Sequence, residues 1–149
     1  MIVYFDTNVV VDILLKREPF FNDSFKALSA IASKSANGII GTSAITDIYY
    51  IINKEIKDKE KSLNSIFNIL KILLLVETIP QDIFTAKVLN IPDFEDSVVS
   101  AIANRNEADY IITRNTDDFA KSSIQAISPS DFLKMIELQS IGSKSEYIR

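Results

Sequence analysis

Short runs of apolar residues alternate with segments of helical periodicity along most of this 149-residue chain. The short runs are rich in Ile, Leu, Val and aromatic residues, which is typical of buried strands. The predicted strands are residues 2–5, 39–40, 74–79, 110–113 and 124–127. Between them, apolar positions recur every three or four residues, which predicts helices. The predicted helices are residues 9–15, a segment from about 21 to a stop near Asn37-Gly38, 44–56, 63–70, 81–89, a helix capped by Asp93, and 131–138.

This alternation predicts an α/β fold, because strand–helix–strand units join parallel strands and place helices on both faces of the sheet. We expect three layers, α/β/α, around a mostly parallel sheet of about four to five short strands. No repeat, low-complexity segment or linker divides the chain, so residues 1–140 are predicted to form a single domain. Residues 141–149 are predicted to be a loosely ordered C-terminal tail.

The composition excludes several classes of chemistry. The chain has no Cys and no His, which excludes disulfides, a thiol nucleophile, a Ser-His-Asp triad and zinc held by thiolate or imidazole. Its three glycines cannot form a phosphate-binding loop. Any metal needs oxygen ligands, which favours Mg2+ or Mn2+. We find no signal peptide and no apolar run of roughly 18 residues, so we expect a soluble, cytoplasmic protein without membrane contact.

Four acidic residues stand at the ends of predicted elements. Asp6 follows the first strand directly, and Asp118 lies shortly after the fourth strand. Asp47 and Asp96 lie in the first turns of the third and sixth predicted helices. Purely structural roles are also open to two of them, because Asp6 can cap the helix that follows it and Asp47 can interact with its helix dipole.

Ligands of open parallel sheets bind outside the carboxyl ends of the strands, so we expect the four acids to converge on one cleft. Clustered carboxylates repel each other, and a divalent cation relieves that repulsion while keeping water ligands for chemistry on phosphates. The pattern therefore indicates a metal-dependent phosphodiesterase. The net charge of −4 argues against binding nucleic acid by charge alone, but bound metal would supply positive charge locally.

Five motifs occur in a fixed order along nearly the whole chain. They are Phe5-Asp-Thr-Asn8, Thr42-Ser43 leading to Asp47, Asp93-Phe-Glu-Asp96, Ala108-Asp-Tyr-Ile-Ile-Thr-Arg-Asn115 followed by Asp118-Phe119, and Ser128-Pro129 before a final Phe-Leu helix. Each is weak alone, but the ordered set resembles the PIN-domain ribonucleases, and most closely the VapC-like toxins of toxin–antitoxin pairs. The resemblance implies a PIN-like fold, an endoribonuclease that depends on Mg2+ or Mn2+, an RNA substrate, a homodimer, and a small antitoxin that covers the active-site groove.

The resemblance also implies four catalytic acids in this chain. Asp6, Asp96 and Asp118 match metal-binding positions, and Asp96 matches better than its neighbour Glu95. Asp47 occupies a position where the family more often has Glu. Because its side chain is one methylene shorter, we expect its carboxylate to reach the metal through water.

The same resemblance implies supporting roles for polar residues near Asp118. The fourth acidic position varies in the family, and Asn115 and Asp117 lie in the same short segment as Asp118. Asn115 is expected to orient a water or a ligand. Thr113 is expected to contact the site or the scissile phosphate.

Two further classes of protein share parts of this pattern. A haloacid-dehalogenase-type phosphatase also has an Asp after its first strand, but it needs a second acid where this chain has Asn8. An inactive PIN-like binding module is compatible with Asp47 in place of Glu and Asn115 in place of an acid. Outside these motifs, Asp12 is predicted to form a surface ion pair with Lys16, one helical turn away.

Overall fold

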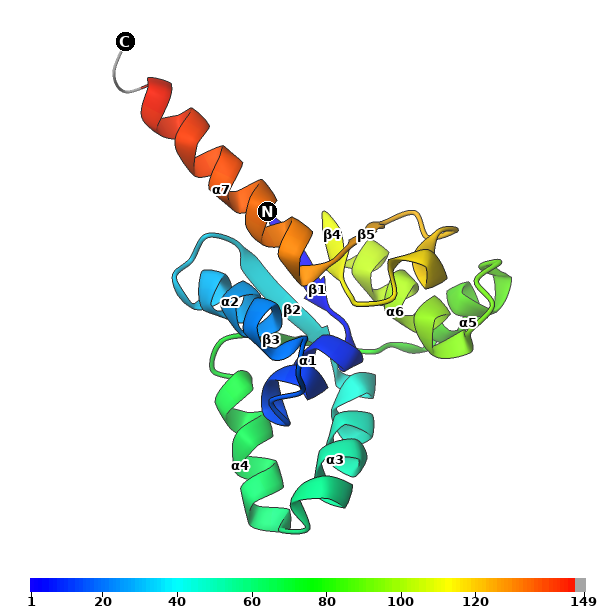
Figure 1. The fold of residues 1–149 in the computed structure, drawn as a ribbon. Helices are drawn as coiled ribbons and strands as arrows, with labels where there is room; N and C mark the ends of the chain where they lie inside the picture. Colours follow the sequence, from blue (N-terminus) through cyan, green and yellow to red (C-terminus); the bar gives the residue numbers. More distant parts are fainter. Residues whose placement is uncertain (147–149) are drawn as a thin grey trace.

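A computed structural model describes residues 1–146 and contains a parallel sheet of five strands (Figure 1). The strands are β1 (Ile2–Phe5), β2 (Asn37–Gly41), β3 (Leu74–Val76), β4 (Tyr110–Ile112) and β5 (Gln125–Ile127). Their order is β3-β2-β1-β4-β5, and each neighbouring pair is parallel. The first strand therefore lies at the centre, and all five carboxyl ends lie at one edge of the sheet.

Helices cover both faces of the sheet, which confirms the predicted α/β/α layers (Figure 1). The α-helices of the described region are α1 (Thr7–Leu14), α2 (Phe21–Ala32), α3 (Thr42–Ile56), α4 (Lys59–Ile69), α5 (Pro80–Val88), α6 (Phe94–Arg105) and α7 (Pro129–Glu146), and a 3₁₀ helix, η1 (Thr116–Phe119), follows β4. Successive side chains of β1 pack into different cores, one on each face of the sheet. Val3 and Phe5 belong to the core with α1, α2, α3, α4 and α7, whereas Tyr4 belongs to the core with α5 and α6.

The boundary between α2 and β2 differs from the sequence prediction because of close packing at Gly38. The helix ends at Ala32, and Gly38 lies inside the strand rather than ending the helix. A Cβ atom at Gly38 would lie 2.5 Å from the side chain of Leu73 and 3.0 Å from that of Ile31. The strand therefore requires glycine where it passes beneath these side chains, and it begins before the predicted residue 39.

The third strand is shorter than the predicted segment 74–79. It ends at Val76, because the chain then turns so that Thr78 binds the start of α3. The Thr78 N–H donates to Oγ1 of Thr42 at 3.0 Å, and its own Oγ1 accepts from the N–H of Ser43 at 3.1 Å. These two bonds connect the start of α5 to the start of α3.

The last helix, α7, is longer than predicted and extends away from the rest of the domain (Figure 1). It continues to Glu146 instead of ending at residue 138, so residues 141–146, which were predicted to belong to a tail, are helical. No proline interrupts this stretch, and a helix interior tolerates Gly142 at a cost of about 1 kcal/mol. The tail prediction for residues 147–149 lies outside the described residues. Across residues 1–146, no helix is sufficiently long and apolar to cross a membrane.

Candidate active site

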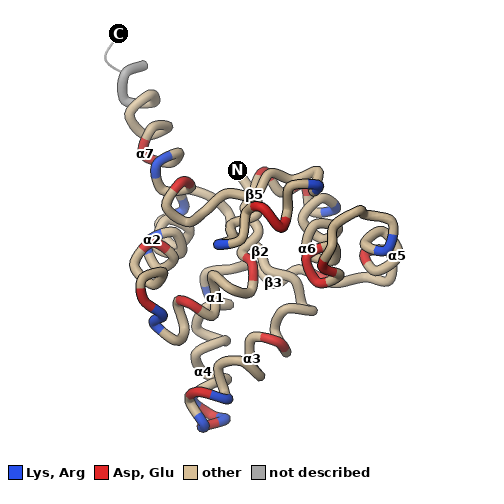
Figure 2. Tube along the Cα trace, turned by 45° about the vertical axis from the view of Figure 1, so that its right-hand side comes forward, with Lys and Arg blue, Asp and Glu red and all other residues tan. Residues whose placement is uncertain are grey.

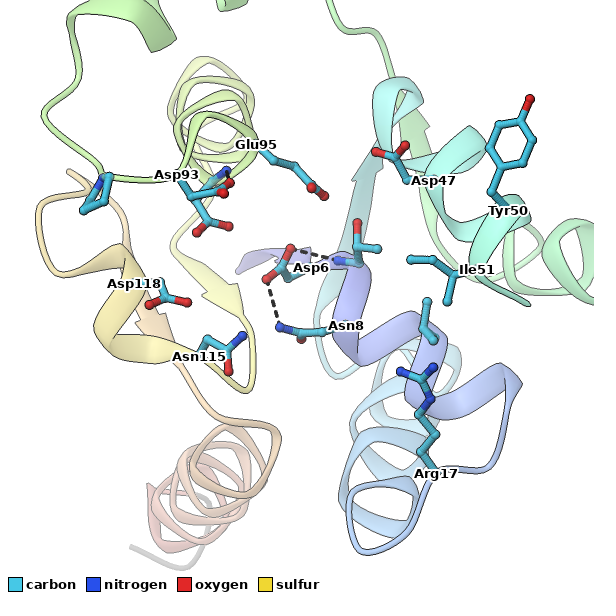
Figure 3. A pocket seen from close by; sticks show the side chains of 14 residues that line it. Asp6, Asn8, Arg17, Asp47, Tyr50, Ile51, Asp93, Glu95, Asn115 and Asp118 are labelled. Carbon is cyan, nitrogen blue, oxygen red and sulfur yellow. Dashed lines mark hydrogen bonds between the residues drawn. The ribbon is translucent and has the colours of Figure 1, made fainter. Parts of the chain in front are cut away.

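A cavity of about 640 Å³ opens at the carboxyl edge of the sheet, beside the end of β1 (Figure 3). Its lining residues are Asp6, Thr7, Asn8, Val11, Arg17, Asp47, Tyr50, Ile51, Pro92, Asp93, Glu95, Asp96, Asn115 and Asp118. All four predicted acids and Asn115 are among them. Figure 2 shows acidic positions from the end of β1, α3, the start of α6 and η1 around this same region. Segments far apart in the sequence therefore bring carboxylates to one place.

Asp6 is the most enclosed of the four predicted acids, with 6% of its surface exposed. Its N–H donates to the carbonyl of Ile112 at 3.0 Å, which fixes its backbone to β4. Its carboxylate accepts from the N–H of Thr7 and from Oγ1 of Thr113, both at 2.8 Å. Burial raises the pKa of Asp6 although both of these bonds lower it. The Thr7 contact makes Asp6 the N-cap of α1, so a helix cap and a cavity carboxylate are the same residue.

Asn8 and Thr113 hold the Asp6 carboxylate in place through side-chain hydrogen bonds. The Asn8 Nδ2 atom donates to Asp6 at 3.3 Å and to Oγ1 of Thr113 at 3.2 Å. The Asn8 Oδ1 atom accepts from the N–H of Arg114 at 3.3 Å, and Thr113 accepts from the N–H of Asn115 at 3.1 Å. Thr113 is fully buried. Its contact is therefore with the site residues, not with the surface that a phosphate would reach.

Asp47 lies in the second turn of α3, not in the first as predicted. The helix begins at Thr42 with Gly41 as its N-cap, so Thr42-Ser43 lies inside the helix instead of preceding it. A carboxylate beyond the first turn gains little from the helix dipole, so an interaction with the dipole does not account for this residue. The exposed Asp47 side chain points toward Glu95 across the cavity (Figure 3).

The first turn of α6 places two further carboxyl groups in the cavity. Burial, and next the neighbouring carboxylate of Asp6, raise the pKa of Asp96 from 3.8 to about 7. Burial and the nearby Asp47 likewise raise the pKa of Glu95. The cavity therefore holds more negative charge than the surrounding protein neutralises, and a bound cation would relieve this imbalance.

The donor set of the cavity fits a cation that prefers oxygen ligands. Within residues 1–146, no three acidic side chains lie close enough together to form a ready-made coordination shell. Mg2+ commonly binds one or two carboxylates and keeps several waters, so it suits this open arrangement better than a dedicated cage. The Asp6 carboxylate is the neighbouring charge that raises the pKa of Asp96 most, so an ion beside these two acids would relieve that repulsion directly.

Arg17 is the basic side chain that lines the cavity within the described residues, and sequence reasoning missed it. It follows α1 and its guanidinium lies at the rim, near Ile51 (Figure 3). The sequence has no periodic signal for this position, because the turn after α1 decides where the side chain points. Asp93 and Glu95 also line the cavity, although the sequence suggested only a cap for the first and disfavoured the second.

The predicted surface ion pair between Asp12 and Lys16 is wrong. Asp12 is fully buried and pairs with Arg114, whose Nε lies 2.6 Å from its Oδ2. The helix ends at Leu14, and Lys16 adopts a left-handed backbone with φ of 51°, so the two residues are no longer one helical turn apart. Arg114 comes from a segment 102 residues away, which local spacing cannot reveal.

This fold and its acidic cavity define the class of protein. A family model described as PIN domain matches residues 2–117, and the chain belongs to that family. It is 26% identical over 135 residues to Ribonuclease VapC1 of Aquifex aeolicus (strain VF5), a match that covers 87% of this chain and 92% of that protein. Its fold is similar to a chain of VapBC2 from Rickettsia felis bound to a promoter DNA fragment (TM-score 0.70, 20% identity, 86% and 98% coverage). It is also similar to a chain of a toxin–antitoxin complex from Klebsiella pneumoniae (TM-score 0.64, 19% identity, 85% and 97% coverage).

Proposed function

We propose that this chain is a metal-dependent endoribonuclease that hydrolyses RNA phosphodiester bonds, and that it is the toxin of a toxin–antitoxin pair. The observation that carries the proposal is the cavity in which Asp6, Asp47, Asp96 and Asp118 come together at the carboxyl edge of the sheet. Membership of the PIN-domain family and the similarity to a protein named Ribonuclease VapC1 support the activity. The similarity to chains of VapBC and toxin–antitoxin complexes supports the toxin role.

In this proposal, Asp6, Asp96 and Asp118 would hold Mg2+ or Mn2+, partly through the waters that such an ion keeps, because no three acidic side chains of residues 1–146 form a ready-made shell. Asp47 would complete the catalytic set through water. When bound there, such an ion would supply an activated water and would offset negative charge on the phosphate oxygens. Thr113 orients the Asp6 carboxylate through the bond at 2.8 Å, and because this bond favours the ionised form, it keeps Asp6 available as a ligand.

The RNA backbone lies between the acids and the rim of the cavity. Arg17 binds a phosphate there, because a guanidinium presents paired donors to phosphate oxygens. Tyr50 lies on the opposite wall from Asn115 (Figure 3). Its ring packs edge-on against Tyr49 but is 71% exposed, so it can also stack on a base. Asn115 orients a water or an RNA oxygen beside Asp118.

The proposal includes two protein partners and a place of action. A small antitoxin covers the cavity, and the exposed Tyr50 and Ile51 on its wall offer that antitoxin an apolar contact. A second copy of this chain forms a homodimer. RNA cleavage takes place in the cytoplasm.

Cleavage of RNA by the purified protein tests the activity. We expect cleavage with Mg2+ or Mn2+, loss of cleavage with EDTA, and a fall of about 10²-fold or more in the single-turnover rate of Asp96→Asn. Asp118→Asn should show a comparable loss, whereas Asp117→Asn is the matched control, because Asp117 does not line the cavity. If wild-type protein and Asp96→Asn behave alike and neither binds metal, the chain is a PIN-like binding module instead.

A further inference from the structure

The ion pair between Asp12 and Arg114 lies behind the cavity and does not line it. Asp12 is fully buried on α1, and Arg114 approaches it with Nε at 2.6 Å and Nη2 at 3.4 Å. The guanidinium also lies over the ring of Phe20, 4.1 Å from its centroid. Arg114 is therefore held by a charge on one side and an aromatic face on the other.

Arg114 stands between the two residues that connect this pair to the site. Thr113 precedes it and donates to Asp6 at 2.8 Å, and Asn115 follows it and lines the cavity. The Arg114 N–H itself donates to Oδ1 of Asn8, and the Nδ2 atom of Asn8 in turn donates to Asp6. Two paths therefore connect Arg114 to Asp6, one through the peptide bond to Thr113 and its hydrogen bond of 2.8 Å, and one through Asn8 by two hydrogen bonds of 3.3 Å.

Helix α1 contacts the segment after β4 at two residues that lie one helical turn apart. Asn8 binds the backbone of Arg114, and Asp12, four residues later on α1, binds its side chain. Residues four apart lie on the same face of a helix, so both contacts hold the segment from the same direction. The segment cannot move away from α1 unless both contacts break.

We propose that Asp12 and Arg114 form a positioning pair that fixes residues 113–115 against α1 and so keeps the Thr113 hydroxyl on the Asp6 carboxylate. This inference rests on the proposed function, since it concerns the placement of its central acid. A buried ion pair is often no more stabilising than an apolar pair of similar volume, so stability alone does not explain its place behind the site. Precise placement of a catalytic group does explain the position of the pair, because small displacements of such a group reduce reaction rates strongly.

An apolar replacement of the whole pair separates positioning from folding. In Asp12→Leu combined with Arg114→Met, we expect a folded protein whose kcat for RNA falls about 10- to 100-fold while KM changes less than about threefold. The matched control is Asp82→Leu combined with Arg105→Met, a second pair of a buried carboxylate and a partly exposed guanidinium that does not line the cavity. Its kcat should stay within about twofold of wild type, and thermal unfolding checks that both variants fold.

Amide hydrogen exchange gives a second readout that needs neither metal nor RNA. In metal-free Asp12→Asn, which keeps the volume of the side chain, exchange at Arg114 and Asn115 should be about tenfold faster than in wild type. Unchanged exchange there, or wild-type kcat in the apolar variant, overturns the inference and leaves the proposed function intact. If wild-type protein shows no metal-dependent cleavage, the proposed function fails, and this inference fails with it.

Discussion

Two ion pairs, each between a buried carboxylate and a partly exposed guanidinium, join different parts of this domain, and their carboxylates are bound to different degrees. Asp82 accepts from Nε of Arg105 at 2.8 Å, from its Nη2 at 2.9 Å and from the N–H of Ile79 at 2.9 Å. Asp12 has one short contact with Arg114 at 2.6 Å and one long contact at 3.4 Å. The first pair connects α5 to α6, and the second connects α1 to the segment that carries Asn115.

The titration behaviour of the two acids follows this difference. Burial raises the pKa of Asp82, but the bonds from Arg105 and Ile79 outweigh it, so the pKa is lowered overall. For Asp12, burial outweighs Arg114, and the pKa is raised. The pair between α5 and α6 therefore stabilises its carboxylate, whereas the pair behind the cavity keeps an acid that its surroundings do not fully satisfy. Similar chemistry therefore favours stability at Asp82 and, in our proposal, placement of the site at Asp12.

Breaking the α5–α6 pair should have the largest effect on folding. Arg105→Met leaves the Asp82 carboxylate buried without its cation, and we expect the free energy of unfolding to fall by about 3–5 kcal/mol. Arg114→Met should cost less, because burial raises the pKa of Asp12 despite Arg114, whereas the bonds to Asp82 lower its pKa, so Arg114 stabilises its partner carboxylate less than Arg105 does. Urea denaturation at neutral pH measures both. A larger loss of unfolding free energy in Arg114→Met than in Arg105→Met would show that the α5–α6 pair is not the more stabilising one.

Asp82 in the α5–α6 pair and Asp96 in the cavity should change the stability of the protein with pH in opposite directions. The lowered pKa of Asp82 contributes stability above its ordinary value of 3.8 that is lost as the pH falls further. The raised pKa of Asp96 has the reverse effect, so metal-free protein should lose stability as the pH rises from about 4 to about 7. Because the Asp96 carboxylate borders the cavity, we expect roughly 1–2 kcal/mol from it.

Urea denaturation in EDTA, repeated between about pH 4 and about pH 7, measures the loss of stability that we attribute to Asp96. Asp96→Asn should reduce the decline, so that the variant is the more stable protein near pH 7, and the remaining decline comes from Asp6 and Glu95, whose pKa values are also raised. A decline of equal size in wild type and Asp96→Asn would show that another group causes it.

The smallest expected effect concerns the rim of the cavity. Arg17→Ala should raise KM for RNA about fivefold and lower the salt dependence of binding by about one phosphate contact, with little change in kcat. Lys16→Ala is the control, because Lys16 is exposed beside Arg17 and does not line the cavity. Equal effects of the two substitutions would mean that Arg17 contributes only general charge.

Local pattern was sufficient to predict the layers and the approximate place of the acids. Asp6 follows a strand whose buried side chains alternate between two cores, and a parallel sheet brings the ends of its strands to one edge. The start of α6 was predictable as well, since the side chain of Asp93 caps it by accepting from the N–H of Asp96 at 3.1 Å.

Contacts between distant segments were not predictable from spacing. Thr113 and Asp6 are 107 residues apart, and Arg114 and Asp12 are 102 apart, so no helical or strand period relates them. Gly38 looked like a helix stop, but close packing of Leu73 explains it. In each case the deciding interaction depends on which element packs against which, and one sequence does not specify that.

Calorimetric titration of Mn2+ into wild type and Asp6→Asn, with RNA cleavage measured on the same samples, tests whether Asp6 binds the metal ion on which cleavage depends. Asn keeps an oxygen that accepts from Thr7 and Thr113, so the variant should fold while losing the carboxylate charge. We predict that wild type binds Mn2+ and cleaves RNA, and that Asp6→Asn loses at least about tenfold in affinity and about 10²-fold in rate. Equal Mn2+ affinity in the two proteins, or cleavage by Asp6→Asn at the wild-type rate, would contradict the account.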